Sequence, residues 1–332
     1  MPDTLPTPTI PFTDPPEIEE YRLPEETSDD PLEREASRII DAAIARAIAC
    51  VNAVKDDRHS YVSFGYDEDA NGYVSALLPE EKGLFDSVLA DVRALRSFTV
   101  YEKEYAGDLK HALFALDKPL TYADPAVSSY FMLDAQFYLK SMEDDTRVGS
   151  IFEIYFDPYM DANTSVSRGK VTLEAVREAV SLLDHVAKRV VRFMPEGLST
   201  YDKYYYLAAV LSERVTYDME PRSRYTAFGA LVEGRAVCEG YSLAYALLCR
   251  EADLWCAFRS GLPRGEGHAW NMIMLEDGIY NVDVTWCDVT DPYRERWYEY
   301  FVKSDADFED HAATSGIAST GVFAPNPYEA AG

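Results

Sequence analysis

The sequence predicts an α+β fold, and three observations support this prediction. Apolar residues recur at helical spacing in several segments between residues 32 and 250. Beyond residue 254 the apolar period changes to two, which indicates β-strands. Asp277-Gly278 lies between two of these strand-like segments and is a strong hairpin signal. Runs of helices followed by hairpin-linked strands are typical of α+β proteins.

The first half of the chain is expected to hold a tail and one domain. Residues 1–31 are rich in Pro, Thr, Asp and Glu and almost lack apolar side chains, so we expect a disordered tail or linker. Residues 32–170 are predicted to form an α+β N-terminal domain of unknown role. Its expected helices are residues 32–55, 79–95, 107–116 and 128–140, and its expected strands are residues 98–105 and 148–157.

The second half, residues 171–332, is predicted to be a separate domain. A long helix over residues 172–194 should end at Pro195 and Gly197. Tyr204-Tyr205-Tyr206 would spread around its helix, so we expect core packing with one ring facing solvent. Two more helices are expected at residues 200–215 and 239–250, and three strands at residues 254–260, 268–275 and 279–287.

Composition excludes some classes of function. The chain has 332 residues and a net charge of −27, so it should repel nucleic acid. No apolar stretch approaches the eighteen residues that a membrane span needs, so no membrane insertion is expected. The sequence does not decide the cellular compartment of the protein. We expect an extracellular or cell-surface location if a leader was removed, and a cytoplasmic location otherwise.

The cysteines suggest neither a metal site nor a disulfide framework. There are five of them, and none forms a Cys-x-x-Cys pair or a Cys/His cluster with zinc spacing. No phosphate-binding loop or nucleotide motif occurs either. We therefore expect no metal and no cofactor, while a bridge between Cys256 and Cys287 stays open.

Three separated residues have the chemistry of a catalytic triad. Cys238, His268 and Asp283 follow one another in the order nucleophile, base and orienting carboxylate. Cys238 should begin the helix of residues 239–250, whose N-terminal N–H groups favour a thiolate and would make the Cys238 N–H one oxyanion donor. Gly240 would allow close approach of a substrate. The alternative is a buried structural cysteine and a hydrogen-bonded strand histidine.

Strand register provides a test of this triad. A two-residue turn at Asp277-Gly278 would pair Asp283 with Met272 and leave it about 13 Å from His268 along the strand. A triad therefore requires a looser turn, a bulge or a strong stagger. A regular ladder with the two side chains far apart would contradict it.

About a third of the chain, from Tyr201 to Asp288, resembles the transglutaminase-like superfamily of papain-type cysteine enzymes, in its bacterial form. The segment from Tyr300 to His311 is similar to the one that closes such domains. The matching motifs are Tyr217-Asp218, Tyr225-Thr226-Ala227-Phe228-Gly229-Ala230-Leu231, Gly234-Arg235-Ala236-Val237-Cys238-Glu239-Gly240-Tyr241, His268-Ala269-Trp270-Asn271 and Asp283-Val284-Thr285-Trp286.

The resemblance implies a papain-like core, in which the helix of the nucleophile packs on an antiparallel sheet. It implies Cys238 as nucleophile, His268 as base and Asp283 as orienter. Some relatives use a Trp upstream of the cysteine as second oxyanion donor; no Trp precedes Cys238, which leaves Tyr225 as the candidate. The remaining candidates for the substrate cleft are Gly240, Tyr241, Trp270 and Trp286.

The expected function is therefore that of a cysteine-dependent hydrolase or acyltransferase with a protein or peptide substrate. Peptidases, amidases and transglutaminases all begin with thiolate attack on an acyl group. Hydrolysis is favoured over cross-linking, because water needs no second binding site. The alternative is a non-catalytic interaction module that retained the fold. The N-terminal domain could also cover the cleft and regulate it, as its size and position suggest.

Overall fold

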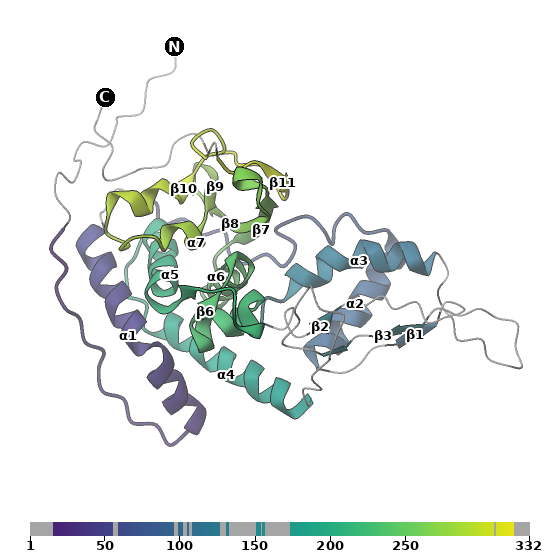
Figure 1. Cartoon of the computed structure of the whole chain (residues 1–332), viewed down its shortest axis with the longest axis horizontal. Coiled ribbons are helices and arrows are strands. Elements are labelled where there is room, and N and C mark those ends of the chain that lie inside the picture. The colour runs from purple at the N-terminus through teal and green to yellow at the C-terminus, as the bar shows by residue number, and fades with distance from the viewer. Residues whose placement is uncertain are drawn as a thin grey trace, which may run out of the picture.

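The structure is a computed structural model. It describes residues 16–55, 59–95, 99–101, 105, 108–126, 131–132, 151–153, 155–156, 173–308 and 310–321. Figure 1 shows a group of helices beside a sheet, with further helices and short strands extending to one side. The α+β class is confirmed.

Four helices form one packed group. α1 (Pro31–Val54) packs against α4 (Leu173–Arg192) and α5 (Thr200–Arg214), and α6 (Cys238–Glu251) packs against α4 and α5. Local sequence fixes where they begin. Asp30 accepts a hydrogen bond from the Leu32 N–H at the start of α1, and Ser199 caps α5 by accepting one from Asp202. All four helices were predicted from sequence within a few residues.

The three consecutive tyrosines of α5 differ from the expectation. All three are fully buried, although adjacent residues point to different sides of a helix. Their hydroxyl groups donate to the backbone carbonyls of Trp255, Pro292 and Val190. The expected solvent-facing ring is therefore wrong, because α5 is surrounded by other elements and each buried hydroxyl has a partner.

A five-stranded antiparallel sheet lies against these helices. Its order is β10-β9-β8-β7-β11, and α6 packs against β8 and β7. The expected arrangement of the 238–251 helix on an antiparallel sheet is confirmed. The strands are β7 (Cys256–Gly261), β8 (His268–Leu275), β9 (Gly278–Val282), β10 (Phe301–Lys303) and β11 (Ala313–Ser315).

The hairpin of β8 and β9 has a different register from the expected one. Leu275 pairs with Gly278, so the two turn residues are Glu276 and Asp277, and the pairing then runs without a bulge to Asn271 and Val282. Of the looser turn, bulge or strong stagger that the triad was expected to require, the ladder shows neither a bulge nor a looser turn. A shift of the regular ladder by two residues brings Asp283 toward His268 instead.

The strand expected over residues 279–287 is wrong in its second half. β9 ends at Val282, and Val284–Cys287 form the short helix α7. Asp283 is its N-cap and accepts a hydrogen bond from the Trp286 N–H. A carboxylate that seemed misplaced within a strand thus sits at the start of a helix.

The remaining elements are two further helices and several short strands and single turns. α2 (Pro79–Arg93) packs on α3 (Leu109–Ala123), and both were predicted in part. The helix expected at residues 128–140 is wrong where it can be tested, since Phe131–Met132 form the strand β2, and residues 133–140 lie outside the described residues. The others are β1 (Thr99–Tyr101), β3 (Ile151–Glu153), β4 (Tyr155–Phe156), β5 (Thr216–Tyr217), β6 (Arg235–Ala236), and the single turns η3 (Arg222–Tyr225), η4 (Gly229–Glu233), η5 (Pro263–Gly265) and η6 (Glu295–Glu299).

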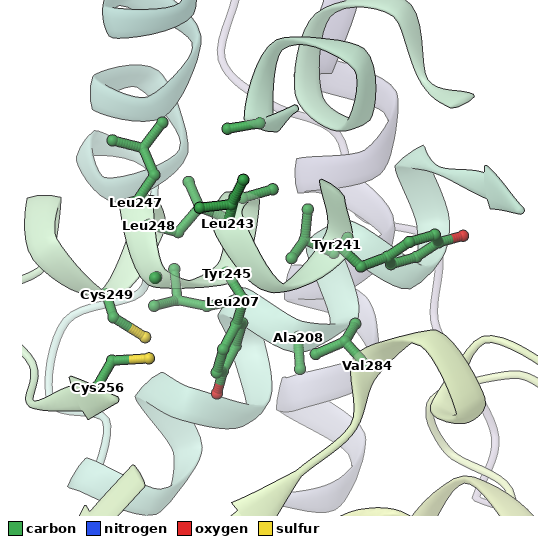
Figure 2. Close-up of a cluster of buried hydrophobic side chains, with 14 of the residues drawn as sticks. Leu207, Ala208, Tyr241, Leu243, Tyr245, Leu247, Leu248, Cys249, Cys256 and Val284 are labelled. Atoms are coloured by element: carbon green, nitrogen blue, oxygen red, sulfur yellow. The ribbon is translucent and has the colours of Figure 1, made fainter. Parts of the chain in front are cut away.

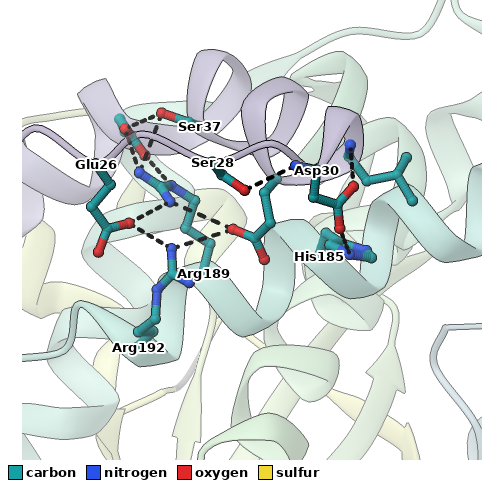
Figure 3. A network of polar contacts seen from close by, with 10 residues as sticks. Glu26, Ser28, Asp30, Ser37, His185, Arg189 and Arg192 are labelled. Atoms are coloured by element: carbon teal, nitrogen blue, oxygen red, sulfur yellow. Dashed lines mark hydrogen bonds and ion pairs between the residues drawn. The ribbon is translucent and has the colours of Figure 1, made fainter.

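The end of the predicted tail is held by charged side chains. Arg189 is almost fully buried and donates to Asp41 at 2.5 Å and to Glu26 at 3.1 Å, and Arg192 donates to Glu26 at 2.8 Å (Figure 3). Within residues 16–30, the Glu26 carboxylate thus compensates part of the charge of the buried guanidinium. The disordered tail over residues 1–31 stays a prediction. The domain boundary near residue 170 stays a prediction, yet α1 packs against α4 and α5 beyond it.

A buried cluster joins α6 to its neighbours. Tyr241, Tyr245 and Leu247 of α6 lie among the apolar side chains drawn in Figure 2. Cys249 and Cys256 face each other there as free thiols. The bridge considered between Cys256 and Cys287 is absent, since both cysteines are free. Among the described helices, none has the length and apolar content to cross a bilayer.

Candidate active site

Cys238 is the first residue of α6, and the backbone before it fixes its place. Gly234 adopts a φ of 75°, which favours glycine, and ends the turn η4. The chain then enters β6, which pairs in parallel with β5, and the Val237 N–H donates to the Arg224 carbonyl at 3.0 Å. A short strand thus delivers the thiol to the start of the helix.

The start of α6 has no side-chain cap. Val237 is the N-cap residue, and its apolar side chain accepts no hydrogen bond from the first turn. The N–H groups of this turn therefore keep their positive partial charge beside the Cys238 sulfur. Cys238 is half-buried, whereas the other four cysteines are buried. The Cys238 thiol is therefore accessible at the start of a helix.

His268 and Asp283 form a short, buried pair. His268 Nε2 lies 2.6 Å from Asp283 Oδ2, and the His268 side chain is 8% exposed while that of Asp283 is fully buried. β8 begins at His268, and β9 ends one residue before Asp283. Since Nε2 faces the carboxylate, the other ring nitrogen, Nδ1, is left for a second partner.

Charge and hydrogen bonding outweigh burial in this pair. Burial alone would lower the pKa of His268, but the charge and hydrogen bond of Asp283, with further contributions from a hydrogen bond to Cys238 and its charge, raise it to about 10. Burial would raise the pKa of Asp283, yet His268 and His311 hold it below its usual range. The pair therefore favours a charged imidazolium beside the thiol.

A second histidine, His311, completes the surroundings of Asp283. Its Nε2 lies 2.9 Å from Asp283 Oδ2, and its Nδ1 lies 2.8 Å from Asp310 Oδ1. The His311 side chain is fully buried and stacks on Phe308 at 3.7 Å between ring centroids. Sequence reasoning placed His311 only in a closing segment, because its contact with Asp283 spans 28 residues and depends on the tertiary fold.

His268, Asp283 and His311 are also residue types that bind metal ions, with one ligand atom of each lying within 4.8 Å of the others. Both imidazole Nε2 atoms face the same carboxylate oxygen at hydrogen-bond distances of 2.6 and 2.9 Å. Zinc sites usually offer their ion at least three protein ligands that converge on it. Here the three groups are directed at one another, so we interpret them as a hydrogen-bonded network.

Asn271 ties the strand of His268 to the helix of Cys238. Its fully buried side-chain amide donates to the Ser242 carbonyl at 3.1 Å. Ser242 lies one turn along α6 from Cys238, and Asn271 lies on β8 with His268. This hydrogen bond helps to fix the distance between the two elements that carry the thiol and the imidazole. Asn271 stood within the recognised motif without a predicted role.

A cleft of about 800 Å³ opens at this site. Tyr217, about half exposed, and Trp286, half-buried, form part of its wall, and the Arg264 guanidinium lies 4.5 Å from the Trp286 ring centroid. Both acidic and basic side chains reach the cleft. It is lined by Ser212, Glu213, Arg214, Val215, Thr216, Tyr217, Pro263, Arg264, Glu266, Gly267, His268, Thr285, Trp286, Asp288 and Val289.

The other predicted site residues lie partly at the cleft and partly behind it. Trp286 lines the cleft, and Tyr225 is half-buried near Tyr217, beneath the Arg224 guanidinium at 4.6 Å. Trp270 is buried behind the site and donates its Nε1–H to Asn281 at 2.9 Å. The expectation that Trp270 forms part of the substrate cleft is therefore wrong.

Two predicted cleft residues serve packing instead. A side chain at Gly240 would clash with the backbone carbonyl of Arg224, so the space beside this glycine is already filled by protein. Tyr241 is buried in the cluster of Figure 2, and its hydroxyl donates to Asp288 Oδ2 at 2.6 Å. The prediction that Gly240 gives a substrate room is wrong on the side where a Cβ would point. There α6 packs against the η3 segment.

Comparison with known proteins concerns the second half of the chain. Residues 185–290 match the family model described as transglutaminase-like superfamily. A solved structure described as a "Putative Cysteine Protease from Cytophaga hutchinsonii" is 16% identical, with 52% of this chain and 63% of that chain covered and a TM-score of 0.29. This chain thus spans less than two thirds of that structure. No curated protein matches the sequence. Residues 185–290 of this chain form a transglutaminase-like superfamily domain.

Proposed function

We propose that this protein is a cysteine-dependent enzyme that acts on amide bonds of proteins or peptides. Cys238 is the nucleophile, His268 the general base and acid, and Asp283 the residue that orients His268. The observation that carries the proposal is the 2.6 Å hydrogen bond between His268 and the fully buried Asp283, beside a half-exposed thiol at an uncapped helix start.

The chemistry follows from this arrangement. The Cys238 thiolate attacks the carbonyl carbon, and the N–H groups at the start of α6 stabilise the negative oxygen that forms. When the C–N bond breaks, His268 gives its proton to the leaving amine, and an acyl thioester remains on Cys238. Water then attacks the thioester, releasing the carboxylic acid and restoring the thiol. An amine in place of water would give transamidation.

The cleft can accommodate a peptide substrate. At about 800 Å³ it has room for several side chains, and its wall combines aromatic rings with charges of both signs. Hydrolysis is the simpler second step, because water requires no second binding site. The alternative, a non-catalytic interaction module, would use the same cleft without the thiol chemistry.

Two measurements test the proposal. A thiol-reactive probe near neutral pH should label Cys238 first; His268→Ala should slow this labelling, and Cys50→Ala should leave it unchanged. Equal and slow labelling of all five cysteines would favour the interaction module.

The second measurement identifies the reaction. The protein is incubated with a casein-like glutamine donor and a labelled amine, with Cys238→Ser as the inactive control. Incorporated label indicates transamidation, new termini indicate peptidase activity, and ammonia release alone indicates deamidation. None of these products, together with unselective labelling, would contradict the proposed function.

A further inference from the structure

Asp288 is a carboxylate on the wall of the cleft. It lines the cleft and ends α7 as its C-cap residue. Its Oδ2 accepts a hydrogen bond from the Tyr241 hydroxyl at 2.6 Å. Among the described residues, no other side chain donates to Asp288, and no basic side chain forms an ion pair with it. An ionised carboxylate has about four acceptor positions, so most of those of Asp288 are left for water or a ligand.

Partial burial makes the charge of Asp288 costly. The residue is half-buried, and this burial raises the pKa of its carboxyl to about 7. The hydrogen bond from Tyr241 acts against this shift, whereas the nearby negative charge of Glu213 adds to it. A carboxylate that loses water without gaining an opposite charge is destabilised. A positive charge brought by a ligand would therefore find a favourable partner here.

Asp288 is joined to the side of α6 that carries the thiol. Tyr241 follows Cys238 by three residues, and positions three apart lie on one side of a helix. The Tyr241 hydroxyl points away from the other side chains labelled in Figure 2 and reaches Asp288. His268 lines the same cleft as Asp288. A peptide held at the thiol and the imidazole would therefore have side chains within the cavity that Asp288 borders.

The two arginines that line the cleft are engaged by other groups. The Arg214 guanidinium donates to two backbone carbonyls of the turn η4. That of Arg264 donates to Asp310 Oδ2 at 2.9 Å. Within the part of the chain that the structure describes, the cleft wall therefore offers Asp288 no direct positive partner.

The other acidic residues of the cleft wall differ from Asp288. Glu213 lies near the end of α5 and accepts a hydrogen bond from Arg46 Nε at 3.3 Å, so it has a positive partner. Glu266 is exposed, and water screens its charge. Asp288 thus combines partial burial, a place on the cleft wall and, among the described side chains, the lack of a positive partner.

We propose that Asp288 determines substrate specificity by forming an ion pair with a lysine or arginine side chain of the peptide. This inference rests on the proposed function and deepens it by naming the class of peptide. An ammonium or guanidinium group would donate to the free acceptor positions of the carboxylate, whereas an apolar side chain of equal length would leave the charge unpaired. The net charge of −27 also favours the approach of a basic peptide.

The test uses thiol-reactive tripeptides that end in a chloromethyl ketone, from which the thiolate displaces chloride. Each probe carries lysine, norleucine or glutamate at one position and alanine at the others. The rate of labelling of Cys238 in the full chain is measured by mass spectrometry at pH 8, where Asp288 is ionised. At one position we expect lysine to react at least about tenfold faster than norleucine, and glutamate to react slowest, because an opposite charge shifts a carboxyl pKa by about one unit or more.

Asp288→Asn should reduce this lysine preference to about parity. The substitution keeps the shape of the side chain and an oxygen for the Tyr241 hydroxyl, but it removes the charge. Comparing lysine with norleucine within each variant cancels any general change in the reactivity of Cys238. Thermal unfolding shows whether the variant is folded, and Asp288→Ser takes its place if it is not.

Two control variants separate a local contact from the overall charge of the protein. Asp291→Asn removes the same charge shortly after Asp288 in the chain, from an exposed pair with Arg294. Asp184→Asn breaks an exposed ion pair with Lys188 on α4. Both variants should keep the full lysine preference, because neither carboxylate lines the cleft.

Equal rates for lysine and norleucine at every position would overturn the inference. A preference that survives in Asp288→Asn, or one that the control variants also lose, would overturn it as well. Selective labelling of Cys238 without a lysine preference would leave the proposed function in place. If no probe labels Cys238 ahead of the other cysteines, the proposed function fails and this inference fails with it.

Discussion

His268 Nε2 and Asp283 Oδ2 are joined by a 2.6 Å hydrogen bond, although Asp283 lies just past the end of the strand that pairs with the strand of His268. Asp283 is simultaneously the N-cap of α7, where its second oxygen accepts the Trp286 N–H at 3.2 Å. One carboxylate thus ends a strand, starts a helix and orients an imidazole. Its burial and three hydrogen bonds leave it little freedom to turn away.

Replacing Asp283 with Asn should strongly impair the chemistry. The substitution keeps the size of the side chain but removes the charge that stabilises the imidazolium. We expect a loss in kcat on the order of 10⁴-fold, as for an orienting carboxylate in a triad. The measurement is the steady-state rate with the amide substrate found by the product assay. Asp184→Asn is the matched control, and equal activity of the two variants would contradict an orienting role for Asp283.

The stability of the protein should fall as the pH rises through about 10, because the folded state raises the pKa of His268 to about that value. A group with a raised pKa contributes stability that is complete below its unfolded value, about 6.5, and declines above it. We expect His268 to contribute on the order of a few kcal/mol at pH 6 and little above pH 10.

Denaturant unfolding at pH 6, 8 and 10 measures this effect as the difference between the natural protein and His268→Gln. The difference should shrink steadily with rising pH. A difference that is constant over this range would show that His268 has an ordinary pKa in the folded protein.

Sequence could predict the residue types of the site but not how they come together. The Asp277-Gly278 pair indicated a turn, yet Gly278 pairs with Leu275 within the ladder. The reason lies far along the chain. The Thr320 and Gly321 N–H groups donate to the Ile279 carbonyl, and this crossing backbone fills the space that a side chain at Gly278 would need. A glycine required for close packing looked like a glycine required for a turn.

The burial of α5 on every side and the long-range partner of His311 could not be predicted, for similar reasons. The period of α5 indicated one apolar face, but it could not show that neighbouring elements cover every side of the helix. His311 has no local signal, since its carboxylate partner Asp283 lies on a different element. By contrast, the long helices and the order of Cys238, His268 and Asp283 are local properties, and these were predictable.

The two tryptophans near His268 should respond differently to truncation. Trp270 is buried and hydrogen-bonded, so Trp270→Ala should destabilise the fold by about 3–5 kcal/mol. Trp286 is half-buried and lines the cleft, so Trp286→Ala should cost less stability and mainly raise KM. Chemical denaturation and steady-state kinetics measure the two effects. The reverse pattern would place Trp270, and not Trp286, at the substrate.

Chelation should leave the chemistry intact. The two imidazoles face one carboxylate oxygen at hydrogen-bond distances, so a metal ion would have to break both contacts to bind there. We expect dialysis against EDTA to change neither the labelling rate of Cys238 nor the turnover. A loss of either that zinc restores would identify His268, Asp283 and His311 as metal ligands.

The packing of α6 on the η3 segment should control the placement of Cys238. A Cβ at Gly240 would clash with the Arg224 carbonyl, while a Cβ at Gly83 in α2 meets nothing within 4 Å. Gly240→Ala should therefore destabilise the protein by about 1–3 kcal/mol and slow the labelling of Cys238, because the start of α6 must move. Gly83→Ala is the matched control and should stabilise the protein by up to about 1 kcal/mol. If both variants label at the natural rate, the position of Cys238 does not depend on this contact.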